Sequence, residues 1–230
     1  GTPIVGTQIA MNSLYAIPGY YLIEECSATS AGNLEWVLEN LMQNAPLPQG
    51  KRLYDYVDEL VAGVNPQVSD VYYLPFLYGS NAHALAKASF VGLTSFHALP
   101  DILRAVYESV AYSAKSHIDK LLSVRPAPKA IRMGGGAARS PLWVQMFADV
   151  LDMPIETVKD VKELGALGCA MAAAVAAGLY KDYKEAAAHR VQVGPPVCPN
   201  AGKAAVYREK YKKYTAVRDA LDNVWGLFTV

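Results

Sequence analysis

A glycine-rich turn between a short strand and a helix constrains this chain more than any other stretch. The segment 130–151 reads AIRMGGGAARSPLWVQMFADVL. Its apolar start predicts a strand, and the three consecutive glycines at 134–136 predict a sharp turn, because glycine adopts backbone angles closed to other residues. Ser140 and Pro141 then predict a helix start, since serine is a favoured N-cap and proline at the first helical position sacrifices no hydrogen bond.

A turn of this kind favours an anionic ligand at the start of the helix. Glycine has no Cβ, so a ligand can approach the backbone closely, and the free N–H groups and positive dipole end of a helix attract phosphate. The spacing is neither GxGxxG followed by an acidic residue nor GxxxxGK[ST], which argues against a Rossmann site and a P-loop. A turn that only solves a packing problem is the alternative.

The rest of the chain alternates between predicted strands and helices. We expect strands within 2–25, as a meander with a turn at Gly6-Thr7, and at 71–77, 90–93 and 154–158. We expect helices at 31–42 (capped by Ser30), 51–64, 164–180, 182–189 and 204–225, with a long helix from Pro100 to before Pro126. This order is typical of one layered α/β domain. The Ala- and Gly-rich run 164–180 is short for a bilayer and predicts a buried helix.

Charge and residue content exclude several function classes. The chain has 21 Lys and Arg against 21 Asp and Glu, so it lacks the cationic footprint of a nucleic-acid binder. Three widely separated cysteines suit a reducing compartment, and we expect a cytoplasmic protein. The histidines are not spaced as metal ligands, and no Gly-x-Ser-x-Gly elbow is present. We expect no nucleic-acid partner, no membrane span and no metal held by side chains of this chain.

Several motifs together resemble the C-terminal domain of the FGGY carbohydrate kinases, within them most closely the xylulose and L-xylulose kinase branch. ASFVGL at 88–93, followed seven residues later by DILRAVYE at 101–108, is similar to the family's C-terminal signature. SAGNLEW at 30–36 resembles its adenosine-side helix start, and MGGGAARS at 133–140 resembles its phosphate-and-nucleoside turn. ELGALG at 163–168 is similar to its late packing helix.

This resemblance implies an α/β fold of the actin-like (ribonuclease H-like) ATPase class, with a mixed sheet flanked by helices. It implies transfer of the ATP γ-phosphoryl group to a sugar hydroxyl, with a ketopentose such as xylulose or L-xylulose as acceptor. ATP and Mg²⁺, the latter held mainly through the phosphates, are the implied cofactors. The sugar contacts and the catalytic Asp are expected in an N-terminal domain, so no catalytic residue is expected here. A homodimer is a further expectation.

Seven residues are assigned to the nucleotide through this resemblance: Gly135, Gly136, Ala137, Ser140, Ala31, Gly32 and Glu35. The first three are expected near the phosphates or ribose, with Ser140 on the same wall, and the last three beside the adenine or ribose. Glu35 has an alternative role as a solvated acid that stabilises the helix dipole. The signature residues Asp101 and Glu108 are expected to be structural, at a helix start and as a hydrogen-bonding acid.

The start of the chain departs from the family pattern. The family's domain opens with a Gly-Thr phosphate turn well upstream of the adenosine-side helix, whereas Thr7 lies only 25 positions before Gly32. We therefore expect Gly6-Thr7 to be an ordinary hairpin turn, and residues 1–230 to lack the first strand of the domain and the sugar-binding domain. Such a fragment is expected to be inactive alone. Two alternatives stay open: a non-catalytic actin-like nucleotide-binding or interaction module, and a glycerol- or gluconate-type kinase.

Overall fold

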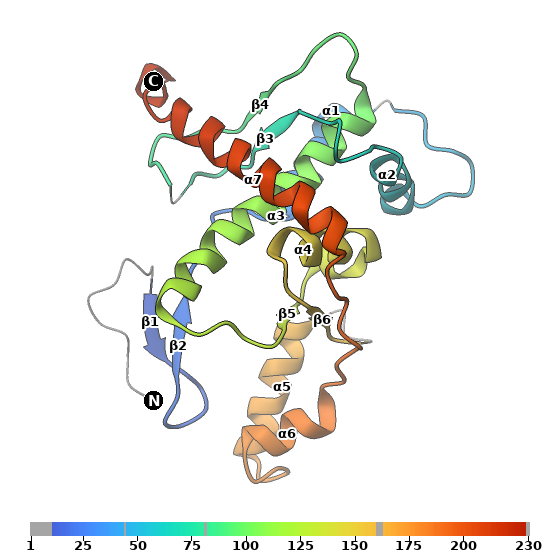
Figure 1. Cartoon of the computed structure of the whole chain (residues 1–230). Helices are drawn as coiled ribbons and strands as arrows, with labels where there is room; N and C mark the ends of the chain where they lie inside the picture. The colour runs from blue at the N-terminus through green and yellow to red at the C-terminus, as the bar shows by residue number, and fades with distance from the viewer. Residues whose placement is uncertain (1–10, 44, 81, 160–162, 229–230) are drawn as a thin grey trace.

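One long helix, α3 (Leu99–Val124), organises the computed structural model, which describes residues 11–43, 45–80, 82–159 and 163–228. The helix α7 (Ala201–Leu221) crosses α3 near its middle (Figure 1). α1 (Gly32–Leu41), α2 (Leu53–Ala62) and α4 (Pro141–Leu151) also pack against α3. The chain therefore builds its core around a single helix rather than around a wide sheet.

The strands of the described residues form three separate pairs. β1 (Met11–Leu14) and β2 (Tyr21–Glu24) are antiparallel, as are β3 (Tyr72–Leu74) and β4 (Ser89–Val91). β5 (Ile131–Met133) and β6 (Ile155–Thr157) are parallel, and α4 provides the crossover between them. The strand directions are thus mixed, as expected, although the strands are distributed over small sheets.

The order of elements predicted from the sequence is largely confirmed. The remaining helices are α5 (Leu164–Ala176) and α6 (Tyr183–Arg190), with short 3₁₀ turns at Gly136–Arg139 and Trp225–Phe228. The predicted cap at Ser30 is wrong, because α1 has Ala31 at its N-cap and no side chain caps it. Ser30 contributes its backbone carbonyl instead, which accepts from Asn33 Nδ2 at 3.0 Å. The predicted Gly6-Thr7 turn lies outside the described residues.

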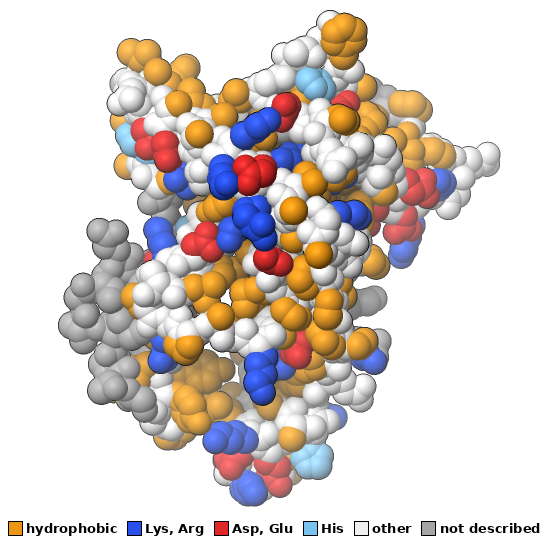
Figure 2. All heavy atoms as spheres, in the orientation of Figure 1, with side chains coloured by type: hydrophobic (Ala, Val, Ile, Leu, Met, Phe, Trp, Pro, Cys, Tyr) orange, Lys and Arg blue, Asp and Glu red, His pale blue; other side chains and the backbone are white. Residues whose placement is uncertain are grey.

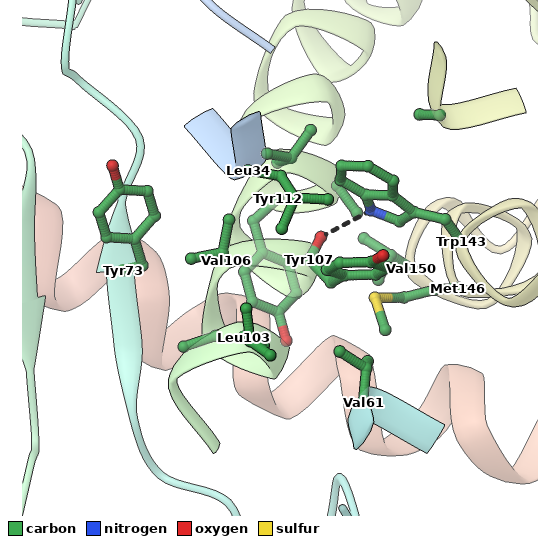
Figure 3. Close-up of a cluster of buried hydrophobic side chains, with 14 of the residues drawn as sticks. Leu34, Val61, Tyr73, Leu103, Val106, Tyr107, Tyr112, Trp143, Met146 and Val150 are labelled. Carbon is green, nitrogen blue, oxygen red and sulfur yellow. Dashed lines mark hydrogen bonds between the residues drawn. The ribbon is translucent and has the colours of Figure 1, made fainter. Parts of the chain in front are cut away.

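The core contains side chains from five helices and β3 (Figure 3). Val106 and Tyr107 of α3 are almost fully buried, and Tyr107 faces Trp143 of α4. The Tyr107 and Trp143 rings stack with centroids 4.2 Å apart, and Trp143 Nε1 donates to the Tyr107 carbonyl oxygen at 3.0 Å. Buried aromatic pairs of this geometry add to the stability gained from their buried area. They fix α4, and the turn that precedes it, against α3.

A buried ion network ties α3 to α7 on the other side of the core. Arg104, Glu108 and Lys210 are each at most 5% exposed. Arg104 Nε donates to Glu108 Oε1 at 2.7 Å, Lys210 pairs with the second carboxylate oxygen, and Arg104 also donates to the Tyr207 hydroxyl at 2.6 Å. Burial lowers the pKa of Lys210, and the adjacent Glu108 carboxylate opposes that shift. Glu108 is therefore a structural acid, as the sequence predicted.

The opposite face of α7 carries charge. Figure 2 shows basic and acidic side chains intermixed over the region where α7 crosses the molecule. The exposed residues Arg208, Glu209, Lys212 and Lys213 belong to this face. Lys212 pairs with Glu209 at 2.8 Å, and Lys213 pairs with Asp70 at 2.9 Å. Exposed pairs like these contribute little to stability because water screens them.

The prediction of a buried helix at 164–180 is wrong in this structure. None of the thirteen residues of α5 is buried, although the segment is rich in Ala, Gly and Leu. α5 packs mainly against α6, and among the described residues no sheet covers its apolar surface. Its first residue touches the glycine turn, since a Cβ added to Gly134 would lie 2.5 Å from Leu164 Cδ1. Among the described residues, no helix is both long and apolar enough to cross a membrane.

Candidate functional site

A cavity of about 620 Å³ lies where the starts of α1 and α2 meet the turn before α4. This volume is typical of small-molecule sites, which range over several hundred Å³. The lining residues come from α1, α2, α3, α4, the 3₁₀ turn and the N-cap positions of three of these helices: Ala31, Gly32, Leu34, Glu35, Arg52, Tyr54, Asp55, Asp58, Tyr107, Gly136, Arg139, Ser140 and Trp143. Segments about a hundred residues apart in the sequence thus share one wall.

Five of the seven residues predicted to bind a nucleotide line this cavity. Ala31, Gly32 and Glu35 come from the start of α1, and Gly136 and Ser140 come from the glycine turn. The other two, Gly135 and Ala137, do not line it. Ala137 points into the core and is 7% exposed, whereas Gly135 shapes the turn behind the wall.

The three consecutive glycines have different structural roles. Gly135 has φ +88°, a backbone conformation that residues with side chains rarely adopt, and a Cβ at Gly134 would require the end of the Leu164 side chain to move. Gly136 has neither constraint, since a Cβ built there meets nothing within 4 Å. Packing and backbone conformation therefore explain two glycines, and the third leaves open space on the cavity wall for a ligand to approach the backbone.

Ser140 connects the glycine turn to α2. Its Oγ accepts from Trp143 N at 3.0 Å, which confirms the predicted N-cap of α4, and donates to Asp58 Oδ2 at 2.7 Å. The Tyr107 hydroxyl donates to the other oxygen of Asp58 at 2.8 Å. Burial is the main cause that raises the pKa of Tyr107, and its hydrogen bond to Asp58 adds to it. The Ser140 hydroxyl is thus already occupied by protein partners, and its role in the wall is to hold the turn in place.

The lining carries more acidic than basic side chains. Glu35, Asp55 and Asp58 contribute carboxylates, and Arg52 and Arg139 contribute guanidinium groups. Arg52 is engaged with Asp55 through two hydrogen bonds of 2.7 and 3.0 Å. Carboxylates accept hydrogen bonds from hydroxyl and amino groups. The α1–α2 side of the cavity is therefore suited to the hydroxylated, uncharged part of a ligand rather than to phosphate.

The acids of α2 were missed by the sequence analysis. Asp55 and Asp58 lie three residues apart, which places them on one face of a helix. The same spacing also occurs on ordinary solvated helices, so the sequence alone does not mark them. Their position opposite the glycine turn depends on the packing of α2 against α3.

Asp101 of the predicted signature also has a structural role. Its Oδ2 accepts from the backbone N of Ala98 at 2.9 Å, so it stabilises the start of α3. Neither Asp101 nor Glu108 lines the cavity. Both expectations from the sequence are confirmed.

Substituting Ser140→Ala should destabilise the chain by about 1 to 2 kcal/mol, because α4 loses its cap and Asp58 loses a donor. Chemical denaturation followed by circular dichroism measures this change. Ser123→Ala, at an exposed serine of α3 whose hydroxyl donates to Lys120 O at 2.6 Å, is the matched control. Equal stability of the two variants would contradict the capping role.

Comparison with known proteins identifies the family of this chain. Residues 2–177 match the model of the FGGY family of carbohydrate kinases, C-terminal domain. The chain belongs to the FGGY family of carbohydrate kinases. The matched range includes the residues 88–108, the start of α1 and the glycine turn, and the last two of these segments line one cavity.

Relatives of this FGGY chain include sugar kinases of several bacteria. It is 34% identical over 207 residues to a probable L-xylulose kinase of Pasteurella multocida, which covers 90% of this chain and 40% of that protein. It is 32% identical to the L-xylulose/3-keto-L-gulonate kinase of Escherichia coli, with the same coverage. The chain thus spans about two fifths of the length of these relatives.

Solved FGGY kinase structures confirm the fold class. The xylulose kinase of Rhodospirillum rubrum superimposes with a TM-score of 0.77 at 28% identity, over 91% of this chain and 41% of that one. The ligand-bound xylulose kinase of Lactobacillus acidophilus gives a TM-score of 0.78 at 26% identity, with the same coverage. The predicted actin-like α/β ATPase fold is therefore correct.

Proposed function

We propose that this chain forms the ATP-binding part of a carbohydrate kinase that transfers the γ-phosphoryl group of ATP to a sugar hydroxyl. One observation carries the proposal. The glycine turn and the start of α1, two FGGY segments about a hundred residues apart, form opposite parts of a single cavity of about 620 Å³. Neither packing nor backbone conformation requires a glycine at position 136, and the missing side chain leaves open space in this cavity.

The lining indicates how ATP would lie. The uncharged nucleoside fits the acidic α1–α2 side, where Glu35 is available to ribose hydroxyls or the adenine amino group. The phosphates fit the side of the glycine turn, where backbone is accessible at Gly136 and where Arg139 contributes a positive charge. Gly135 and Ala137 act in this proposal by shaping the turn rather than by contact with ATP.

Phosphoryl transfer depends mostly on positioning and on stabilisation of phosphate charge. In this proposal the chain positions ATP, and the sugar and the carboxylate that accepts its proton belong to the part of the kinase that corresponds to the rest of the relatives' length. Among the described residues, no group of three or more His, Cys, Asp or Glu side chains is arranged to hold a metal ion. Mg²⁺, which would neutralise phosphate charge, is accordingly proposed to be held mainly by the phosphates themselves.

The proposed acceptor is a ketopentose, xylulose or L-xylulose. Support comes from the names of the relatives and of the solved structures, among which these two activities recur. We further propose a cytoplasmic location, which suits the three exposed cysteines Cys26, Cys169 and Cys198, and a homodimer.

A chimaeric kinase tests the proposed activity. This chain would replace the matched part of the L-xylulose/3-keto-L-gulonate kinase of Escherichia coli, and ADP release would be measured with ATP, Mg²⁺ and L-xylulose. We expect turnover that depends on L-xylulose. In this proposal the chain supplies the ATP site, and the rest of the Escherichia coli kinase supplies the sugar site. The same chimaera carrying Gly136→Leu is the control and should lose turnover.

One outcome would favour a non-catalytic module instead. If the chimaera folds cooperatively and binds ATP, yet releases no ADP with L-xylulose, D-xylulose or glycerol, the chain binds a nucleotide without supporting transfer.

A further inference from the structure

A second cavity, of about 390 Å³, lies in the wedge where α3 and α7 diverge beyond their crossing (Figure 1). It is lined by the C-terminal half of α3, the end of α7 and the loop after β3. It shares no lining residue with the nucleotide cavity. Tyr107 of α3 lines the first cavity and Ser113 lines the second, so one helix contributes to both.

One buried polar atom on this wall, Asp222 Oδ1, has no hydrogen-bond partner among the described residues. Buried polar groups normally find partners, because leaving them without one costs free energy. The Ser113 and Tyr214 side chains line the same cavity and are 8% and 1% exposed. The Asp222 carboxylate with these two hydroxyls beside it therefore indicates a ligand that carries several hydrogen-bonding groups.

The charges of the wall exclude a strongly ionic ligand. Arg218 pairs with Asp219 at 2.7 Å, and His117 and Lys120 both approach Glu25 Oε2, at 3.2 and 3.4 Å. Each cationic side chain of the wall is thus paired with a nearby carboxylate. Asp222 is the acid whose buried oxygen still needs a donor.

The remaining lining is rich in hydroxyl groups and aromatic faces. Ser27, Ser80 and Ser116 lie around the cavity, together with Tyr211 and Phe76. Burial raises the pKa of Tyr211 to about 12, so its hydroxyl stays protonated at neutral pH. Hydroxyls that donate and accept, a carboxylate that accepts and apolar ring faces together match a molecule with alternating C–H and O–H groups.

We propose that this cavity binds a neutral polyol or sugar of about five carbons, at a site separate from the ATP cavity. A ligand hydroxyl donates to Asp222 Oδ1, and others pair with the Tyr214 and Ser113 hydroxyls. The ligand thereby satisfies the buried Asp222 oxygen that lacks a partner among the described residues.

Isothermal titration calorimetry with xylitol, on the 230-residue chain in the presence of ATP, tests the proposal. Tyr214→Phe and Asp222→Asn should each weaken xylitol binding about tenfold, because each removes a hydrogen bond to the ligand without changing shape. The matched controls are Tyr15→Phe and Asp152→Asn, at exposed residues outside the cavity, and these should bind xylitol as the wild type does.

Tyr214→Phe also gives a readout of folding. Phenylalanine keeps the ring that packs against Tyr112 and Tyr211, so the melting temperature without xylitol should not fall. The proposal is overturned if xylitol, glycerol and sorbitol all fail to bind the wild type. It is equally overturned if xylitol binds Tyr214→Phe and Asp222→Asn with unchanged affinity, since the polyol then occupies another place on the chain.

Discussion

Gly136→Leu is expected to reduce ATP affinity by at least about a hundredfold, equivalent to about 2.7 kcal/mol, while the chain stays folded. The added side chain meets no protein atom near its Cβ and instead extends into the cavity that we assign to ATP. Isothermal titration calorimetry with ATP and Mg²⁺ measures the loss. The melting temperature should stay close to that of the wild type, because position 136 has no strained backbone angle and no crowded neighbour.

The neighbouring glycine is the control for this result. Gly135→Ala adds a Cβ at φ +88°, which should cost about 1 to 2 kcal/mol of stability while leaving the cavity wall itself unobstructed. Gly136→Leu is thus expected to lower ATP affinity without lowering stability, whereas Gly135→Ala is expected to lower stability. ATP affinity of Gly136→Leu equal to that of the wild type would rule out this cavity as the nucleotide site.

Glu108→Gln is expected to destabilise the chain by about 3 to 5 kcal/mol, the typical cost of removing one partner from a buried ion pair. Glu108 is 1% exposed and is the carboxylate between Arg104 and Lys210, both of which are nearly as buried. The amide has the same shape but leaves two buried cations without a counter-charge. Urea unfolding followed by circular dichroism measures the shift in midpoint.

An exposed acid on α7 provides the comparison. Glu209→Gln breaks the pair with Lys212, in which both side chains are 67% exposed, and should change stability by less than about 0.5 kcal/mol. If Glu108→Gln unfolds at the same urea concentration as Glu209→Gln, then the buried network does not hold α3 to α7.

Features that depend on neighbouring residues in the chain could be predicted from the sequence. Ser140-Pro141 identified the start of α4 because capping depends on residues adjacent in the chain. The glycine turn and the start of α1 were assigned to one ligand through family motifs, and the structure brings five of the seven chosen residues to one wall. The other two, Gly135 and Ala137, do not line that wall, and Ala137 is buried.

Features that depend on tertiary packing could not be predicted from the sequence. Asp55 and Asp58 reach the cavity only because α2 packs on α3, and their spacing is common on solvated helices. The exposure of α5 was predicted wrongly, because apolar composition describes what a helix can bury and not what lies beside it. Lys210 of the buried network sits among charged neighbours in the sequence, where a solvent-exposed position is the expected one.

The stacked pair of Tyr107 and Trp143 places a fluorescent side chain on the wall of the cavity that we assign to ATP. The chain has three tryptophans, and the Trp143 indole lies on the wall of that cavity with its Nε1–H fixed to a backbone carbonyl. Trp225 is buried beside Phe228 and lines neither cavity, so its emission provides a constant background. Occupancy of the cavity changes the polarity around the Trp143 indole, and the protein thus carries an intrinsic fluorescent probe of its own ligand without any added label.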